Sequence, residues 1–140
     1  MRKLTKLWQL PAADLLLLAA AAALLLLFTT AIRTLPFATV SRLQWPAPAR
    51  RRDSPAARAR ILRAVRTAAP YLPAANCLPQ ALAARALLRA HGAPANLRLG
   101  VTKTETGQLQ AHAWLECQGR IVLGGFSALS RYTALADFEP

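Results

Sequence analysis

The chain of 140 residues is long enough for one compact domain with its own core and too short for two. It carries 18 Lys and Arg against 6 Asp and Glu, and residues 1–66 hold 12 of the basic and 2 of the acidic ones, so the excess positive charge belongs to the N-terminal part. The charge-balanced remainder argues against a dedicated nucleic-acid domain. Two cysteines without a C-x-x-C pattern argue against a disulfide framework and a metal cluster, and favour reduced thiols in the cytosol.

An apolar segment, Leu15 to Ile32, contains 18 residues without a charge. Its length lies at the lower edge of a membrane span, which needs about 17–25 residues. It is long for the roughly 7–15 apolar residues of a signal peptide, and R-T-L-P-F after it is a poor cleavage site. Two interpretations remain open: a membrane helix, or a helix that packs on the following domain or on a partner. Basic residues at both ends give no orientation across a membrane, but they suit a helix that lies at its cytoplasmic face.

Residues 44–55 read Q-W-P-A-P-A-R-R-R-D-S-P and are predicted to form a linker between an N-terminal helical segment, 1–43, and a domain at 56–140. Ser54 and Pro55 suit an N-cap and a first helical position, so a helix is predicted from there to about Ala69. Its arginines are interpreted as a solvated face rather than a site for an acidic partner.

The segment N-C-L-P-Q-A-L-A-A-R-A-L-L-R-A-H-G has apolar residues at helical spacing. Pro79 is acceptable only in a first turn, and Gly92 is a helix stop. A second helix is therefore predicted to begin at Cys77 and to end before Gly92.

After this helix the hydrophobic period changes to two. Alternation around Leu97–Val101, a Gly107 turn, a strand over 109–117, a Gln118-Gly119 turn and a strand over 120–123 predict a three-stranded antiparallel meander. The predicted class is therefore α+β, with the Cys-bearing helix packed on a small antiparallel sheet.

Cys77 and His112 are the candidate catalytic residues. The free N–H groups and the dipole at a helix N-terminus stabilise a thiolate, which is the nucleophilic form of cysteine. The same N–H groups can bind the oxyanion that forms when a carbonyl is attacked. His112, in the middle of a predicted strand, could present a general base to that helix end.

Other candidates carry weaker arguments. His91 lies roughly 20 Å from Cys77 along the predicted helix, and its position in the last turn suits a dipole-complementing role. Cys117 is interpreted as a small buried residue. Trp114 is interpreted as core or pocket wall.

Taken together, these segments resemble the lasso peptide biosynthesis B protein family, the microcin-processing leader peptidases of the transglutaminase-like superfamily. The resemblance rests on C-L-P-Q-A-L-A-A-R-A-L-L-R-A-H-G, L-R-L-G-V, A-H-A-W-L-E-C-Q-G-R-I-V-L-G-G and R-Y-T-A-L-A-D-F, over about residues 56–138. The apolar helix ending in L-P-F is also similar to the N-terminal region of that family.

The resemblance implies a papain-like α+β core and proteolytic removal of the leader from a lasso precursor peptide. It assigns Cys77 as nucleophile and His112 as base and then acid. Its implied partners are the precursor peptide, a leader-recognition protein and an asparagine-synthetase-like cyclase. We expect no cofactor and no metal, and because no G-x-x-x-x-G-K-[ST] motif occurs, ATP would belong to the cyclase.

The sequence departs from the wider superfamily at the residue that orients the histidine, which is usually an Asp on the next strand. Here that strand reads R-I-V-L-G-G, with Gly124 and Gly125 near the expected place. Glu116, which shares a strand face with His112, Asp137 on the C-terminal tail, and a backbone carbonyl are the alternatives.

Two other functions compete with the peptidase. One is a non-catalytic, membrane-associated scaffold of a peptide-maturation complex, suggested by the apolar helix and the missing third residue. The other is nucleic-acid binding through the arginine-rich segment 50–66, which would be strongly salt-dependent. We expect a peptidase in the cytoplasm and no nucleic acid partner. The N-terminal helix either contacts the inner face of the membrane or packs on the domain or a partner.

Overall fold

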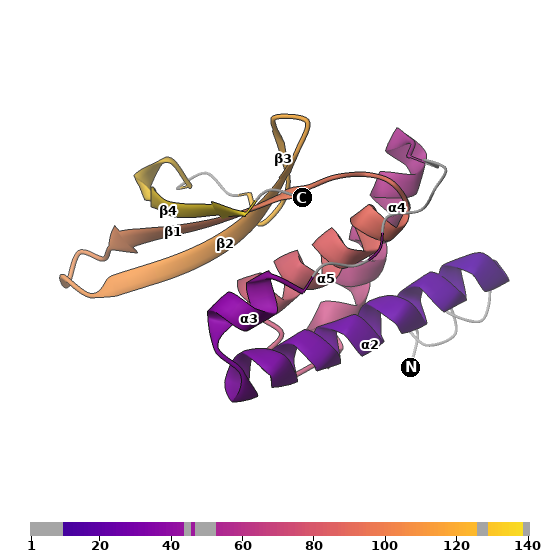
Figure 1. The fold of residues 1–140 in the computed structure, drawn as a ribbon, viewed down its shortest axis with the longest axis horizontal. Helices are drawn as coiled ribbons and strands as arrows, with labels where there is room; N and C mark the ends of the chain where they lie inside the picture. The colour runs from indigo at the N-terminus through magenta and orange to yellow at the C-terminus, as the bar shows by residue number, and fades with distance from the viewer. Residues whose placement is uncertain (1–9, 44–45, 47–52, 126–128, 139–140) are drawn as a thin grey trace.

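A computed structural model describes residues 10–43, 46, 53–125 and 129–138, and places a helical layer on one face of an antiparallel sheet (Figure 1). The elements in chain order are α2 (Ala12–Thr34), α3 (Phe37–Ser41), α4 (Pro55–Ala68), η2 (Ala69–Tyr71), α5 (Cys77–Ala90), β1 (Asn96–Lys103), β2 (Leu109–Cys117), β3 (Arg120–Leu123), η3 (Leu129–Arg131) and β4 (Thr133–Phe138). The predicted α+β class is confirmed.

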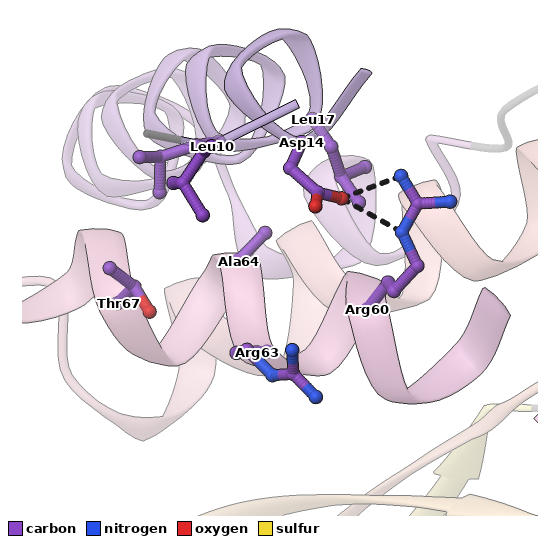
Figure 2. A pocket seen from close by; sticks show the side chains of 8 residues that line it. Leu10, Asp14, Leu17, Arg60, Arg63, Ala64 and Thr67 are labelled. Carbon is purple, nitrogen blue, oxygen red and sulfur yellow. Dashed lines mark hydrogen bonds and ion pairs between the residues drawn. The ribbon is translucent and has the colours of Figure 1, made fainter. Parts of the chain in front are cut away.

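Helix α2 packs one face on α4 and α5. Ala21, Leu25 and Phe28 are buried there and belong to the same apolar core as the later helices and the sheet. At the other end of the helix, Asp14 accepts hydrogen bonds from the guanidinium of Arg60 on α4, and Figure 2 shows the two side chains facing each other beside a small cavity. The packing that was predicted as one of two alternatives for the apolar helix is therefore present.

The opposite face of α2 is apolar and exposed. Leu16 is 72% exposed and Leu26 is 59% exposed. By length and composition alone, this helix could also cross a membrane. The two faces of α2 thus differ in burial, although both are rich in leucine and alanine.

Helix α4 begins as its sequence predicts. The hydroxyl of Ser54 accepts a hydrogen bond from the backbone N–H of Ala57 at 3.1 Å, and Pro55 is the first helical residue. Ile61, Leu62 and Val65 are buried on one face of the helix. Most of the predicted linker, 44–45 and 47–52, lies outside the described residues, so the proposed boundary stays a prediction.

Three arginines of α4, Arg58, Arg60 and Arg66, have specific partners, so this face is not uniformly solvated as predicted. Besides the pair with Asp14, Arg58 forms an ion pair with Asp53 at 3.5 Å. Arg66 donates a hydrogen bond to the carbonyl oxygen of Val122 at 2.8 Å and so ties α4 to β3.

Helix α5 begins at Cys77 and ends two residues before Gly92, as predicted. The short helix η2 and the residues that follow it connect α4 to α5. Gln80 Nε2 donates to the carbonyl oxygen of Ala75 at 2.7 Å, which fixes the approach of the chain to the helix.

The sheet has the strand order β3-β2-β1-β4, so the prediction of a three-stranded meander is wrong by one strand. The three predicted strands and their turns are present, with Gly100 opposite His112 in the β1–β2 register. The fourth strand, β4, pairs with β1 across a bulge between Leu99 and Gly100. It was missed because T-A-L-A-D-F has no strong alternation, and its strand state depends on pairing with a distant segment.

The two faces of the sheet have different environments. Leu97, Ala113, Leu115 and Cys117 belong to the apolar core shared with the helices. Successive strand side chains point to opposite faces, so His112, Trp114 and Glu116 lie on the face away from that core. Consistent with this, the ring of Trp114 covers Gly100 on this second face.

Candidate active site

Cys77, the candidate nucleophile, lies at the N-terminus of a helix. It is the first residue of α5, and its side chain is half-buried at the edge of the apolar core. The backbone N–H groups of Cys77 and Leu78 lie in the first turn, where a helix offers them no acceptor, and Pro79 has no N–H. Two N–H groups are thus available beside the sulfur for a developing negative charge.

His112 lies on β2, a central strand flanked by β1 and β3. Its ring is stacked with that of Trp114, with centroids 6.3 Å apart and an angle of 16° between the planes. The ring of Tyr132 is tilted against it at 5.7 Å. The Nε2 atom is 2.7 Å from the carbonyl oxygen of Gly124. Three neighbours therefore restrain the plane and the direction of this imidazole.

The helix with Cys77 and the strand with His112 pack together, because α5 contacts both β1 and β2. The contacts described for Cys77 are with the apolar core, and those described for His112 are on the other face of the sheet. A hydrogen bond between the thiol and the imidazole is not among the interactions of the described residues. The predicted pairing of these two side chains therefore stays a proposal.

A polar cavity of about 370 Å³ opens beside His112. Thr102 and Gln110, from the ends of β1 and β2, form part of its wall. Arg131 and Tyr132, which belong to the described part of the β3–β4 connection, form another part. The imidazole is thus accessible from a hollow wide enough to receive a side chain of a bound peptide.

The three alternatives for the residue that orients His112 can be compared. Glu116 is engaged elsewhere: Oε1 accepts a hydrogen bond from Trp114 Nε1 at 3.0 Å, and Oε2 forms an ion pair with Arg98 Nε at 2.9 Å. Asp137 pairs through its backbone with Arg98, and its side chain lies outside the described part of the structure.

The third alternative, a backbone carbonyl, has a direct contact with the ring. The carbonyl of Gly124 comes from the R-I-V-L-G-G segment, where the superfamily pattern places its third residue. Gly124 was noted in the sequence as a departure from the pattern. The sequence could not identify its carbonyl, because every residue has a backbone carbonyl and the residue type does not show which one contacts the ring.

The remaining sequence candidates have structural roles. His91 caps the end of α5, where its Nδ1 is 2.9 Å from the carbonyl oxygen of Leu87. Cys117 is buried, and its thiol donates to the carbonyl oxygen of Pro94 at 3.3 Å. Trp114 is buried against β1. Tyr132, which packs on His112, was not singled out from the sequence, because only the return of β4 to β1 brings it there.

Charge near α5 is dominated by arginine. Burial lowers the pKa of Arg85, and the neighbouring Arg89 lowers it further. Arg85 donates to the carbonyl oxygen of Ser41 at 3.4 Å and so links α5 to α3. Within the residues that the structure describes, no cluster of three or more His, Cys, Asp or Glu side chains could hold a metal ion.

Comparison with known proteins matches residues 22–137 to the model of the transglutaminase-like superfamily. The match begins inside α2 and ends in β4, so it includes the Cys77 helix and the His112 strand. No curated protein and no solved structure matches the chain. Since the family model covers most of the chain, this protein belongs to the transglutaminase-like superfamily.

Proposed function

We propose that the protein is a cysteine peptidase that removes the leader from a lasso precursor peptide, a ribosomally made peptide that is later closed as a macrolactam. The observation that carries the proposal is the position of Cys77 as the first residue of α5, in a chain of the transglutaminase-like superfamily. The resemblance of the Cys77 and His112 segments to lasso peptide B proteins supports the substrate class.

The reaction needs two groups from this site. The thiolate of Cys77 attacks the scissile carbonyl carbon, and the N–H groups of Cys77 and Leu78 bind the oxygen as it becomes negative. His112 takes the thiol proton and then gives it to the departing amine, and water releases the leader from the thioester. The mechanism requires the imidazole and the thiol to come together when the precursor binds, because the described contacts of Cys77 are with the apolar core and those of His112 are on the other face of the sheet.

Substitution of His112 tests the assigned base. We expect His112→Gln to lower the rate of leader release about 10²- to 10³-fold, since general base catalysis contributes roughly that much. The measurement is mass spectrometry of the leader fragment, after mixing the protein with its precursor peptide and its leader-recognition protein. His91→Gln, at the other histidine of the chain, is the matched control and should cleave at the parent rate. Equal rates for the parent and His112→Gln would remove His112 from the mechanism.

The proposed partners follow from the same resemblance: the precursor peptide, a leader-recognition protein and an asparagine-synthetase-like cyclase. Peptide maturation of this kind takes place in the cytoplasm, which agrees with two free cysteines.

A second candidate function is favoured by the exposed leucines of α2. Leu16, Leu26 and Leu27 are each at least half exposed, and they lie along a helix whose other face is buried in the domain. We propose that this face contacts the inner surface of the membrane, with α2 in the plane of the surface. If the protein is a non-catalytic scaffold of a peptide-maturation complex, this membrane contact would be its main function.

Vesicle binding tests the membrane contact. The double substitution Leu16→Gln and Leu26→Gln should weaken binding to phosphatidylcholine and phosphatidylglycerol vesicles about tenfold or more, because burial of one leucine side chain contributes roughly 1.5–3 kcal/mol. Co-sedimentation measures the bound fraction. Leu109→Gln, at an exposed leucine on β2, is the control and should bind like the parent. Unchanged binding of the double variant would exclude this face as the contact.

A further inference from the structure

The hydrogen bond between His112 and Gly124 defines the protonation of the imidazole. The Nε2 atom and the carbonyl oxygen are 2.7 Å apart. A carbonyl oxygen can only accept, so Nε2 carries the hydrogen. In the neutral ring Nδ1 is then the unprotonated nitrogen, and it is the atom that can take a proton from a thiol.

The position of the Gly124 carbonyl is fixed by close packing on β2. Gly124 has a φ of 78°, which residues with a Cβ rarely adopt. A Cβ at this residue would lie 2.8 Å from the carbonyl oxygen of Ala113 and 3.1 Å from the Cα of Trp114. Both neighbours belong to the strand that carries His112, and neither is the flexible end of a side chain. A glycine is therefore needed for the carbonyl to lie against β2 at this point.

Tyr132 and Trp114 hold the ring plane from the sides, while the carbonyl sets the direction of Nε2. The carboxylate of Glu116 is bound by Trp114 and Arg98, and strand geometry places its Cα roughly 13 Å along β2 from that of His112. Among the described residues, Nε2 has a direct contact with a backbone carbonyl.

We propose that Gly124 is the positioning residue of this active site, an inference that rests on the proposed peptidase function. Its carbonyl holds His112 in the tautomer with hydrogen on Nε2. This leaves Nδ1 as the nitrogen that takes the proton of Cys77 in the proposed mechanism. The imidazolium formed in that step keeps its Nε2 hydrogen bond and later returns the Nδ1 proton to the departing amine. A backbone dipole thereby takes the orienting role that an acidic side chain has in the wider superfamily.

The test compares Gly124→Ala with Gly119→Ala. Gly119 has a similar φ of 73°, but a Cβ there would meet no atom within 4 Å, so this control reproduces the backbone strain without the collision. The first readout is nitrogen and proton NMR of ¹⁵N-histidine in the full chain at about pH 8. The two histidines should be in opposite tautomers, because His91 donates through Nδ1 to Leu87.

The parent and Gly119→Ala should show a protected Nε2–H proton on His112, and Gly124→Ala should lose it. In the leader-release assay, Gly124→Ala should lower kcat about 10²-fold with little change in KM, since a misplacement of about 1 Å can cost that much. An Nδ1–H tautomer of His112 in the parent overturns the proposal, even if Gly124→Ala does not fold. So does a Gly124→Ala variant that keeps both the protected proton and kcat. A parent with the protected proton and no leader release refutes the peptidase and the positioning role, and leaves the hydrogen bond itself standing.

Discussion

Replacing Cys77 by Ala should lower the rate of leader release about 10⁴-fold or more. The thiolate forms the covalent bond to the scissile carbonyl, and no other group at the start of α5 can replace it, because Leu78 and Pro79 follow and Asn76 precedes. Loss of a nucleophile typically removes about 10⁴-fold or more of the rate, since the residual activity comes only from binding and the oxyanion site. Mass spectrometry of the precursor mixture over time measures both the leader fragment and the shortened product.

Cys117→Ala is the matched control, because Cys117 is the other cysteine of the chain and is buried away from the helix start. Its thiol hydrogen bond to Pro94 is structural, so this variant should keep the parent rate and lose a small part of its stability. A peptide electrophile should label the parent and Cys117→Ala but not Cys77→Ala. If Cys77→Ala releases leader at the parent rate, the peptidase proposal is refuted and the scaffold is favoured.

The second large effect concerns α2. We expect Leu25→Ala to lower the free energy of unfolding by about 2–5 kcal/mol, the range seen when a buried leucine is truncated in a packed core. Leu25 is 0% exposed and lies in the core that α2 shares with α4, α5 and the sheet. Urea denaturation followed by circular dichroism measures the change as a shift in the midpoint with an unchanged slope.

Leu26→Ala is the control next to it in the sequence. Leu26 is 59% exposed, so its truncation should change the free energy of unfolding by less than about 0.5 kcal/mol. A large difference between the two variants means that α2 is a structural helix of the domain. Equal, small effects would mean that α2 does not pack on the domain in solution, as expected of a helix whose whole surface faces lipid.

Local chemistry allowed several elements to be predicted from the sequence. Ser54 and Pro55 begin α4 because a side-chain acceptor and a missing N–H both suit a helix start. Gly92 ends α5, and period-two alternation with a Gly107 turn predicts the β1–β2 hairpin. Each of these signals depends on a few neighbouring residues, so it can be recognised in the sequence without the tertiary structure.

The fourth strand and the orienter of His112 required the tertiary structure. Residues 133–138 form strand β4 because they hydrogen-bond to β1, more than 30 residues earlier in the chain. No sequence pattern in these residues indicates that pairing. Tyr132 reaches His112 only through the same return of the chain. The Gly124 carbonyl is a backbone group, which every residue has, so only its place in space distinguishes it.

Cys77 and its surroundings show what the sequence determines and what the tertiary structure determines. The sequence by itself determined that this thiol begins a helix and that the protein has an α+β plan, because capping, proline and periodicity are local properties. Only the tertiary structure decided which leucines of α2 are buried and which sheet face His112 occupies. Those outcomes depend on contacts between distant segments, where packing of one apolar face against another selects the arrangement.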